Sequence, residues 1–95
     1  MLVIAAMLKV LDDKGDELER EFNKLVPKIR SDPGVIGYIV HRNIDDPSRF
    51  FVYEKYESKK ALDDSFLTTH FQEFFKAFES IKDGEPEIRV YKEVA

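Results

Sequence analysis

The sequence predicts an α+β fold of the ferredoxin-like type, in which helices cover one side of a four-stranded antiparallel sheet. Three observations support this prediction. Four short segments are rich in β-branched and aromatic residues, two longer segments carry apolar residues at helical spacing, and together they follow the order βαββαβ. A chain of 95 residues has room for one modest core, so residues 1–95 are expected to form a single domain.

The first strand and the first helix are predicted from the amino-terminal third of the chain. Residues 2–10 are rich in aliphatic side chains and run into a turn signal at Asp12–Gly15. The helix is predicted from one apolar stripe, formed by Leu18, Phe22, Leu25, Val26 and Ile29. Pro27 is expected to kink the last turns of this helix, and Asp32-Pro33-Gly34 is expected to end it.

A β-hairpin is predicted in the middle of the chain. Residues 35–42 and 49–56 are β-branched and aromatic, and the segment 43–48 between them is a cluster of turn formers. Ser58 is placed to cap a short helix that carries three apolar residues, Ala61, Leu62 and Phe66.

The last helix and strand are predicted from the carboxy-terminal third. Thr69 followed by Gln72 fits a capping box that opens a helix. The apolar stripe of this helix consists of Phe71, Phe74, Phe75, Phe78 and Ile81. Asp83-Gly84 is expected to end the helix, and residues 87–94 are predicted to form the last strand after Pro86.

The predicted strands are apolar on both faces. In the third strand, one face carries Phe50, Val52, Glu54 and Tyr56, and the other carries Phe51, Tyr53 and Lys55. The second strand groups Ile36, Tyr38 and Val40 against Val35, Ile39 and His41, and the first groups Leu2, Ile4, Ala6 and Leu8 against Val3, Ala5 and Met7. Helices cover only one face, so the other face would expose apolar area on the order of several hundred Å². The sequence therefore predicts a homodimer through a two-fold contact of sheet on sheet.

Composition excludes several classes of function. The net charge is −4 and the basic residues are scattered among acids, which argues against a nucleic-acid partner. The absence of cysteine excludes disulfides and thiol chemistry, and the two histidines, His41 and His70, lack a third soft ligand, so no metal site is expected. The apolar start has no basic region and is interrupted by Lys9, which predicts neither a signal peptide nor a membrane span. A cytoplasmic protein is expected.

Three blocks of the sequence resemble the antibiotic biosynthesis monooxygenase family. They are the runs 32–38 (DPGVIGY), 46–62 (DPSRFFVYEKYESKKAL) and 68–74 (TTHFQEF), which occur in the order and spacing of the family. The resemblance implies a dimeric α+β barrel with a pocket between sheet and helices in each subunit. It also implies an oxygenase that uses no metal or flavin, because the best-known members act in this way on phenols, anthrones or quinols.

The chemistry of such substrates explains how a cofactor can be dispensed with. A deprotonated phenol or quinol is electron-rich enough to give an electron directly to O₂. The protein then needs only to bind an aromatic ring, accept its proton and exclude water. A Phe-rich cavity with one titratable group suits this task, so the expected partners are a small aromatic substrate and O₂.

The resemblance points to His70 as the catalytic residue. His70 matches the histidine that precedes an aromatic residue in the helix motif of the family, and it would act as a base or as a hydrogen-bond donor to the substrate oxygen. The alternative is a polar residue that supports the start of the helix or faces solvent. The family usually has proline where this chain has Thr69, which bears on the pose of the histidine.

The remaining candidate residues are aromatic, hydroxylated or charged side chains on the predicted strands and helices. They are predicted to bind substrate and comprise Tyr38, Tyr53, Glu54, Tyr56, Phe66, Phe71, Phe74 and Arg89. Each has a structural alternative: core packing for the phenylalanines, a hydrogen bond for the tyrosines, the dimer contact for the Glu54 and Tyr56 pair, and an ion pair for the arginine.

Two other functions remain open at this stage. The runs 49–54 and 68–71 also resemble the isomerase that processes phosphorylated autoinducer-2, although this chain has Ser65 where that enzyme tends to carry a second histidine. An isomerase of this kind needs cations for a phosphate, and the candidates are Arg42, Arg49, Lys55 and Arg89. A non-catalytic small-molecule-binding dimer is the third possibility. The haem-degrading relatives are disfavoured because they use an Asn, Trp and His set, and this chain has no Trp.

Overall fold

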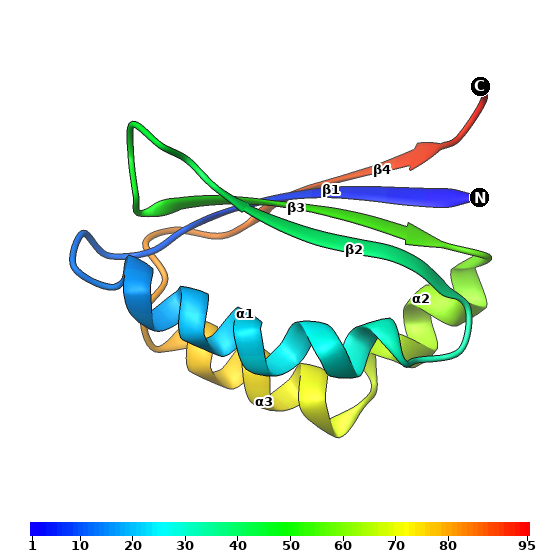
Figure 1. Cartoon of the computed structure of the whole chain (residues 1–95), viewed down its shortest axis with the longest axis horizontal. Coiled ribbons are helices and arrows are strands. Elements are labelled where there is room, and N and C mark those ends of the chain that lie inside the picture. Colours follow the sequence, from blue (N-terminus) through cyan, green and yellow to red (C-terminus); the bar gives the residue numbers. More distant parts are fainter.

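The fold is a single four-stranded sheet with three helices packed against one of its faces (Figure 1). A computed structural model describes all residues from Met1 to Ala95. The elements in chain order are β1 (Leu2–Lys9), α1 (Gly15–Arg30), β2 (Val35–Arg42), β3 (Arg49–Tyr56), α2 (Lys59–Phe66), α3 (Thr69–Glu79) and β4 (Glu87–Lys92). The two central strand predictions are confirmed to the residue, and β4 ends two residues before the predicted limit of Val94.

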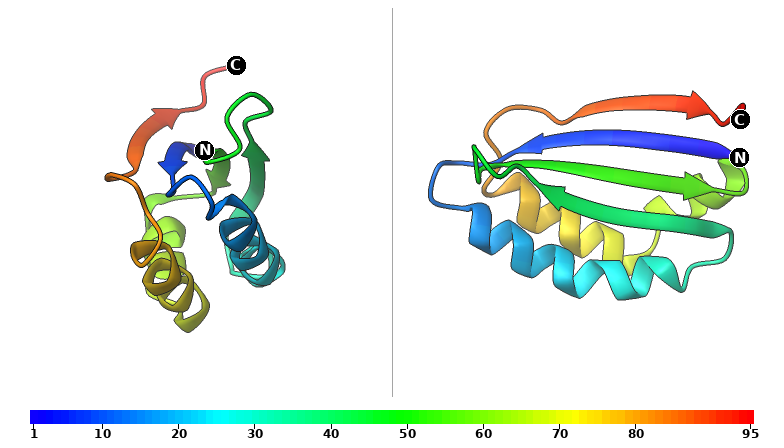
Figure 2. Two further views of the ribbon diagram at one scale, coloured as in Figure 1. Left: turned by 90° about the vertical axis from the view of Figure 1, so that its left-hand side faces the viewer. Right: turned by 45° about the horizontal axis from the view of Figure 1, so that its top comes forward.

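The strands lie in the order β2-β3-β1-β4, and every neighbouring pair is antiparallel. β1 therefore occupies the interior of the sheet and pairs with β3 on one side and β4 on the other. The end-on view in Figure 2 shows the helices together on one side of the sheet and no helix on the other side. This arrangement confirms the predicted ferredoxin-like α+β class. No helix is both long and apolar enough to cross a membrane.

The core lies between the helix-facing side of the sheet and the apolar stripes of α1 and α3. Alternate residues of β1 are buried on this side, and the predicted stripe of α1 packs against them, with all of its residues buried except Val26, which is partly buried. Sixteen buried apolar residues form one cluster, which includes Ile4, Leu18, Phe22, Val52, Tyr56, Phe74 and Phe78. One continuous core of this size is what a single domain of this length requires.

The turn between α1 and β2 depends on Gly34. Its φ angle of +79° is in the left-handed region, which favours glycine. A Cβ atom at this position would lie 2.5 Å from the Cβ atom of Ala61 on α2, so the two elements approach too closely for a larger residue. The carbonyl of Gly34 also accepts a hydrogen bond from the backbone N–H of Glu57 at 2.9 Å. The turn after α1 is thereby fixed to the end of β3.

A β-bulge at the start of β2 places Val35 on the helix-facing side of the sheet, opposite to the predicted side. The register shifts between Val35, which pairs with Tyr56, and Gly37, which pairs with Lys55. The extra residue, Ile36, reverses the alternation, so Val35 packs against the core instead of sharing a face with Ile39. A one-residue insertion leaves no mark in an apolar pattern, and this part of the prediction was therefore wrong.

The predicted cap of α2 is confirmed, whereas that of α3 is one residue off. The hydroxyl of Ser58 accepts a hydrogen bond from the backbone N–H of Ala61. In α3 the cap is Thr68, which accepts from the N–H of Phe71, while Thr69 is already helical. Gln72 does not complete a capping box, because its amide donates to the carbonyl of Phe66 at 2.7 Å.

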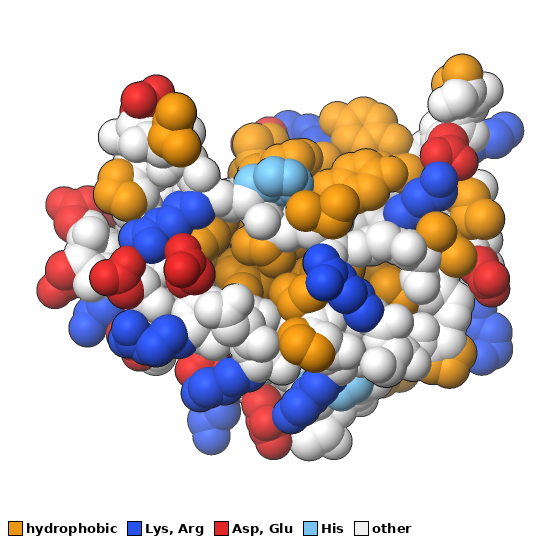
Figure 3. Space-filling model, viewed as in Figure 1, with side chains coloured by type: hydrophobic (Ala, Val, Ile, Leu, Met, Phe, Trp, Pro, Cys, Tyr) orange, Lys and Arg blue, Asp and Glu red, His pale blue; other side chains and the backbone are white.

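The face of the sheet opposite the helices carries an apolar surface, hereafter the open face. Its apolar side chains are Val3, Ala5, Met7, Ile39, Phe51, Tyr53 and Tyr91. Met7, Ile39 and Phe51 keep 44%, 47% and 39% of their surface exposed. Figure 3 shows apolar side chains gathered over the sheet, above a layer of charged side chains around the helices. Nothing in the chain itself covers this face.

Candidate functional site

An apolar cavity lies between the helix-facing side of the sheet and helix α3. Its volume is about 70 Å³, and all but two of its lining residues are hydrophobic. The lining consists of Ile4, Ala6, Leu8, Phe22, Tyr38, Val52, Glu54, Phe66, Phe71, Phe74, Phe75, Phe78, Pro86 and Ile88. Glu54 is the one charged residue in this set, and Tyr38 is the one hydroxyl. A single ionisable acid in an apolar cavity is the usual mark of a ligand site.

Five of the nine predicted site residues line this cavity. Glu54 and Tyr38 face each other across the β2–β3 pair, where they are register partners. The other three are Phe66, Phe71 and Phe74. The period-two alternation of β3 places Glu54 on the helix-facing side, together with two buried apolar residues, Phe50 and Val52.

The phenylalanines form a stacked wall around the cavity. The rings of Phe66 and Phe71 stack with centroids 4.7 Å apart, and Phe74 lies 4.7 Å from Phe22 across the core. Ligand pockets in proteins usually measure about 300–1,000 Å³, so a substrate can enter only if aromatic side chains move. Phe75 and Ile88 are the most exposed residues of the lining, with 40% and 50% of their surface accessible.

Glu54 is held by one hydrogen bond and is otherwise unpaired. The hydroxyl of Tyr56 donates to its Oε1 atom at 2.7 Å, and no basic side chain forms an ion pair with it. Only 5% of Glu54 is exposed, and burial raises its pKa to about 7, although the bond from Tyr56 acts in the opposite direction. Burial and the neighbouring charge of Glu54 raise the pKa of Tyr38 and of Tyr56 above the usual range, so both tyrosines stay protonated.

The structure places His70 in a second polar cluster, outside the cavity lining. Its Nε2 atom lies 3.0 Å from Oδ2 of Asp32, and the hydroxyl of Ser65 donates to the same oxygen at 2.8 Å. Asp32 lies in the α1–β2 turn, Ser65 in α2 and His70 in α3, so one carboxylate joins three segments. His70 lines a separate hollow of about 60 Å³ between α1 and α3, which shares only Phe74 with the cavity.

Tyr53 and Arg89 lie on the open face, away from the cavity. Both are register partners of Ala5 in β1, whose side chain points away from the helices. Arg89 pairs with Glu87 at 2.7 Å. Tyr56, the ninth predicted residue, is fully buried, does not line the cavity, and donates a hydrogen bond to Glu54, which does.

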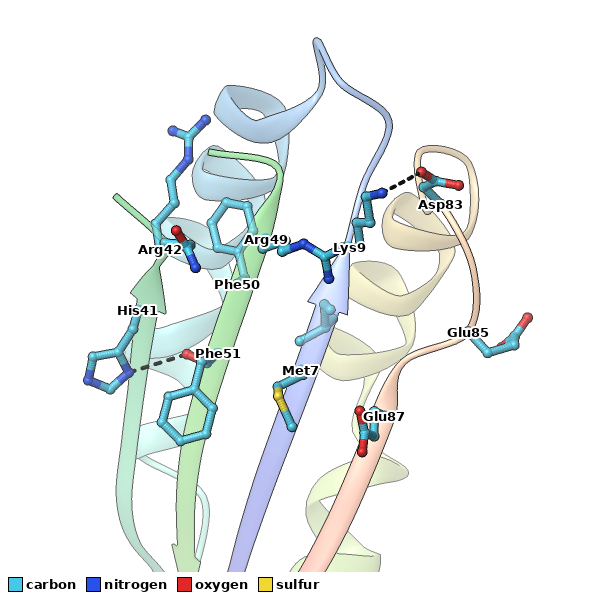
Figure 4. Close-up of a pocket in the computed structure, with 12 residues that line it drawn as sticks. Met7, Lys9, His41, Arg42, Arg49, Phe50, Phe51, Asp83, Glu85 and Glu87 are labelled. Carbon is cyan, nitrogen blue, oxygen red and sulfur yellow. Dashed lines mark hydrogen bonds and ion pairs between the residues drawn. The ribbon is translucent and has the colours of Figure 1, made fainter. Parts of the chain in front are cut away.

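A larger hollow, of about 410 Å³, lies at one end of the open face. Figure 4 shows Met7, Phe51 and His41 side by side on neighbouring strands, with Lys9 and Arg49 at one end. The ring of His41 stacks on that of Phe51 with centroids 5.3 Å apart.

The charges around this hollow are already paired. Lys9 lies 3.3 Å from Asp83, and Arg49 lies 2.9 Å from Asp46. Its lining holds three acidic residues, three Lys or Arg residues and His41. This mixture selects for no particular ligand, so the smaller apolar cavity is the stronger candidate site.

Sequence reasoning missed Asp32, the partner of His70, because 38 positions separate the two residues. It assigned Phe75 and Phe78 to the apolar stripe of the helix without naming them as site residues; Phe78 is buried in the core, Phe75 is 40% exposed, and both line the cavity. No signal in the sequence pointed to Pro86 or Ile88, which reach the cavity only because β4 lies beside β1. No group of three or more His, Cys, Asp or Glu residues that could hold a metal ion is present.

Comparisons of the sequence with known proteins identify relatives. A family model described as "Antibiotic biosynthesis monooxygenase" matches residues 1–77. A Bacillus subtilis protein named "Putative monooxygenase YcnE" is 30% identical over 74 residues, which cover 78% of each chain. The Synechocystis protein sll1783 is 30% identical over 91 residues, which cover 96% of this chain. The match spans only 62% of the length of sll1783.

A comparison of structures agrees with the sequence comparisons. A solved structure from Nitrosomonas europaea, described as "Putative antibiotic biosynthesis monooxygenase", matches 100% of both chains with a TM-score of 0.96. The sequence identity of this pair is 20%, so the likeness shows the shared fold alone.

Proposed function

This chain belongs to the antibiotic biosynthesis monooxygenase family, and from that premise we propose that it oxidises a small electron-rich aromatic compound with O₂. The substrate class is a phenol or quinol, the reaction needs no metal or flavin, and the active form is a cytoplasmic homodimer. The observation that carries the proposal is the cavity lining. Aromatic rings surround a space with two titratable side chains, which suits an aromatic ring that must lose one proton in the absence of water.

In the proposed reaction, the substrate first loses a hydroxyl proton to a protein base. The phenolate then transfers one electron to O₂, and the phenoxyl radical and superoxide combine by forming a carbon–oxygen bond. The resulting peroxide takes up a proton, its O–O bond breaks, and the carbon that carries it loses its hydrogen as a proton, so that this carbon becomes a carbonyl. One oxygen atom stays in the product, the other leaves as water, and the substrate supplies all four electrons.

The identity of the base has two candidates. The role of His70 as the proton acceptor stays a prediction. The ring of His70 is hydrogen-bonded to Asp32 and is not part of the cavity lining. The alternative role, support for the start of α3, agrees with this bond. Glu54 is the ionisable acid that does line the cavity.

Oxygen consumption with a panel of monocyclic hydroquinones tests the proposal. We expect one O₂ to be consumed per substrate, with one atom of ¹⁸O from labelled O₂ appearing in the product. Ala6 lines the cavity, so Ala6→Leu should fill it and lower the rate at least about tenfold. Ala77→Leu in α3, outside the cavity, is the matched control. No uptake with any hydroquinone would contradict the proposal and favour a non-catalytic binding protein.

No observation favours the phosphosugar isomerase. None of the four candidate cations, Arg42, Arg49, Lys55 and Arg89, lines the apolar cavity. Arg42 pairs with Asp16 and Glu19 on α1, and Lys55 pairs with Glu93. A phosphate in the cavity would therefore lack a positive partner.

The homodimer is proposed on the composition of the open face. Apolar side chains on all four strands leave a surface that a second copy would bury by a two-fold contact. We expect the protein to sediment at twice its chain mass of 11.1 kDa. Phe51→Glu should give the monomer, and Asn23→Glu, which adds the same charge on α1, should not. A wild-type protein that sediments as the monomer at micromolar concentration would contradict the dimer.

A further inference from the structure

The oxygen atoms of Glu54 and Tyr38 are the polar groups that face the cavity with unused hydrogen-bonding capacity. Tyr56 occupies Oε1 of Glu54, and no protein group donates to Oε2. The hydroxyl of Tyr38 likewise forms no hydrogen bond within the protein, and because no fully buried side-chain nitrogen or oxygen lacks a partner, this hydroxyl is open to solvent. The two residues are opposed on neighbouring strands, which brings the Cβ atoms of such pairs to about 4.5–5.5 Å. Both side chains line the same cavity, and burial and the charge of Glu54 raise the pKa of Tyr38, so a ligand in the cavity lies beside both residues.

We propose that Glu54 accepts the hydroxyl proton of the substrate through Oε2, that Tyr56 positions its carboxylate, and that Tyr38 donates a hydrogen bond to the oxyanion left on the substrate. This inference rests on the proposed function. The substrate O–H bond breaks, an O–H bond forms on Oε2, and the electron pair stays on the substrate oxygen. The negative charge moves from one oxygen to another within the cavity, and no second buried charge is created.

The surroundings of Glu54 suit it to this role. Ile4 from β1, Phe22 from α1 and the phenylalanines of α3 face it with apolar surface, and the titratable groups beside it are Tyr38 from β2 and Tyr56 from its own strand. Burial raises the pKa of Glu54 to about 7. The residue is then substantially ionised at neutral pH, and its pKa lies closer to that of a phenol, about 10, than the pKa of an exposed carboxyl does.

The pH dependence has a defined direction. Glu54 acts as a base only in its ionised form, so kcat/KM should rise with pH and level off above a midpoint near 7. Tyr56 lowers the pKa of Glu54 by donating to it, so its removal should move this midpoint upward. A merely structural role for Tyr56 would change stability and leave the midpoint where it is.

The first experiment measures hydroquinone oxidation by Glu54→Gln, Tyr56→Phe and the matched control Glu57→Gln, which makes the same change at an exposed position. We expect Glu54→Gln to lower kcat by about 10²–10⁴-fold, Tyr56→Phe to raise the pH midpoint, and Glu57→Gln to change neither. A Glu54→Gln rate within about threefold of wild type, or an unmoved midpoint in Tyr56→Phe, would overturn the assignment.

The second experiment needs no turnover and separates this inference from the proposed function. 4-Nitrophenol serves as the probe, and its affinity for wild type and for Glu54→Gln is measured between pH 6 and pH 9. If Oε2 and the phenol oxygen share one proton, the wild-type affinity should be highest near pH 7 and lower at both pH 6 and pH 9, whereas the affinity of Glu54→Gln should change in one direction only, with the ionisation of the phenol. Wild-type and variant affinities that change with pH in parallel would overturn the inference. A wild-type maximum near pH 7 in a protein that oxidises no hydroquinone would support Glu54 as the phenol-binding acid while the oxygenase proposal fails.

Discussion

The Glu54–Tyr56 pair and the Asp32–Ser65–His70 cluster each contain one largely buried carboxylate with hydrogen-bonding partners. They differ in whether a carboxylate oxygen is left without a hydrogen bond next to the cavity. In the first, Oε2 of Glu54 accepts no bond from the protein and belongs to the cavity lining. In the second, Oδ2 of Asp32 accepts from Ser65 and bonds His70 at once. The clusters are near neighbours, since the charge of Asp32 contributes to the raised pKa of Tyr56.

The difference indicates separate roles for two acids of similar chemistry. A carboxylate whose bonds are used within the protein joins segments, and removing it leaves buried groups without partners. A carboxylate with a free oxygen beside an apolar cavity is costly to ionise and gains from a ligand that shares its charge. The histidine that sequence resemblance favours for catalysis belongs to the first kind of cluster in this structure.

Removal of Asp32 should have the largest effect on stability. Asp32→Ala leaves the buried hydroxyl of Ser65 and the ring of His70 without their common acceptor, and two hydrogen bonds to a charged group are worth about 4 kcal/mol together. Urea denaturation measures this loss, with Asp45→Ala in the exposed β2–β3 loop as the control. A loss below about 1 kcal/mol would mean that the cluster does not hold the three segments together.

Glu54 should destabilise the folded protein as pH rises. Its folded pKa of about 7 lies above the value of 4.5 expected when unfolded, so the folded state binds the proton more tightly between these values. The free energy of unfolding should fall from pH 4.5 to pH 7 by on the order of 3 kcal/mol from this group. The same denaturation series in Glu54→Gln should lack this component. Parallel wild-type and variant profiles would show that Glu54 is solvated like an exposed acid.

His70→Asn should have a moderate effect on stability and a small one on catalysis. An amide can still donate to Asp32, so we expect a loss of about 1 kcal/mol, which corresponds to one weakened hydrogen bond. Hydroquinone oxidation should stay within about threefold of the wild-type rate. A drop in the oxidation rate as large as that expected for Glu54→Gln would indicate that His70 is the base. The two clusters would then no longer differ in their roles.

Local patterns predicted most of the fold, because the elements that carry it are regular. Residues 35–42 and 49–56 are strands in the structure, as predicted, because turn formers bound these β-branched and aromatic runs. The bulge at Ile36 was not predictable, because an inserted residue in an apolar run leaves the pattern intact. The alternation of β3 placed Glu54 on one face with Phe50 and Val52, although it did not reveal which face the helices cover.

The site was predictable only where it depends on local pattern. The phenylalanine stripe of α3 indicated that Phe71 and Phe74 would meet the sheet, and both line the cavity. The bond between His70 and Asp32 depends on how the α1–β2 turn packs against α3, and no spacing in the sequence encodes that contact. The unused oxygen of Glu54 follows from the absence of a basic neighbour, which a strand pattern does not specify.

Two neighbouring threonines at the start of α3, Thr68 and Thr69, should show the smallest difference in stability. Thr68 accepts from the N–H of Phe71 and donates to the carbonyl of Ser65, so it fixes the turn that carries His70 toward Asp32. Thr68→Ala should therefore cost about 1 kcal/mol, the typical value of an N-cap, whereas Thr69→Ala in the first turn should cost less than about 0.5 kcal/mol. Because Glu54 is held by Tyr56 on β3, neither variant should move the pH midpoint of hydroquinone oxidation. A shifted midpoint in Thr68→Ala would show that the two clusters are coupled, and Glu54 could then no longer be treated as independent of α3.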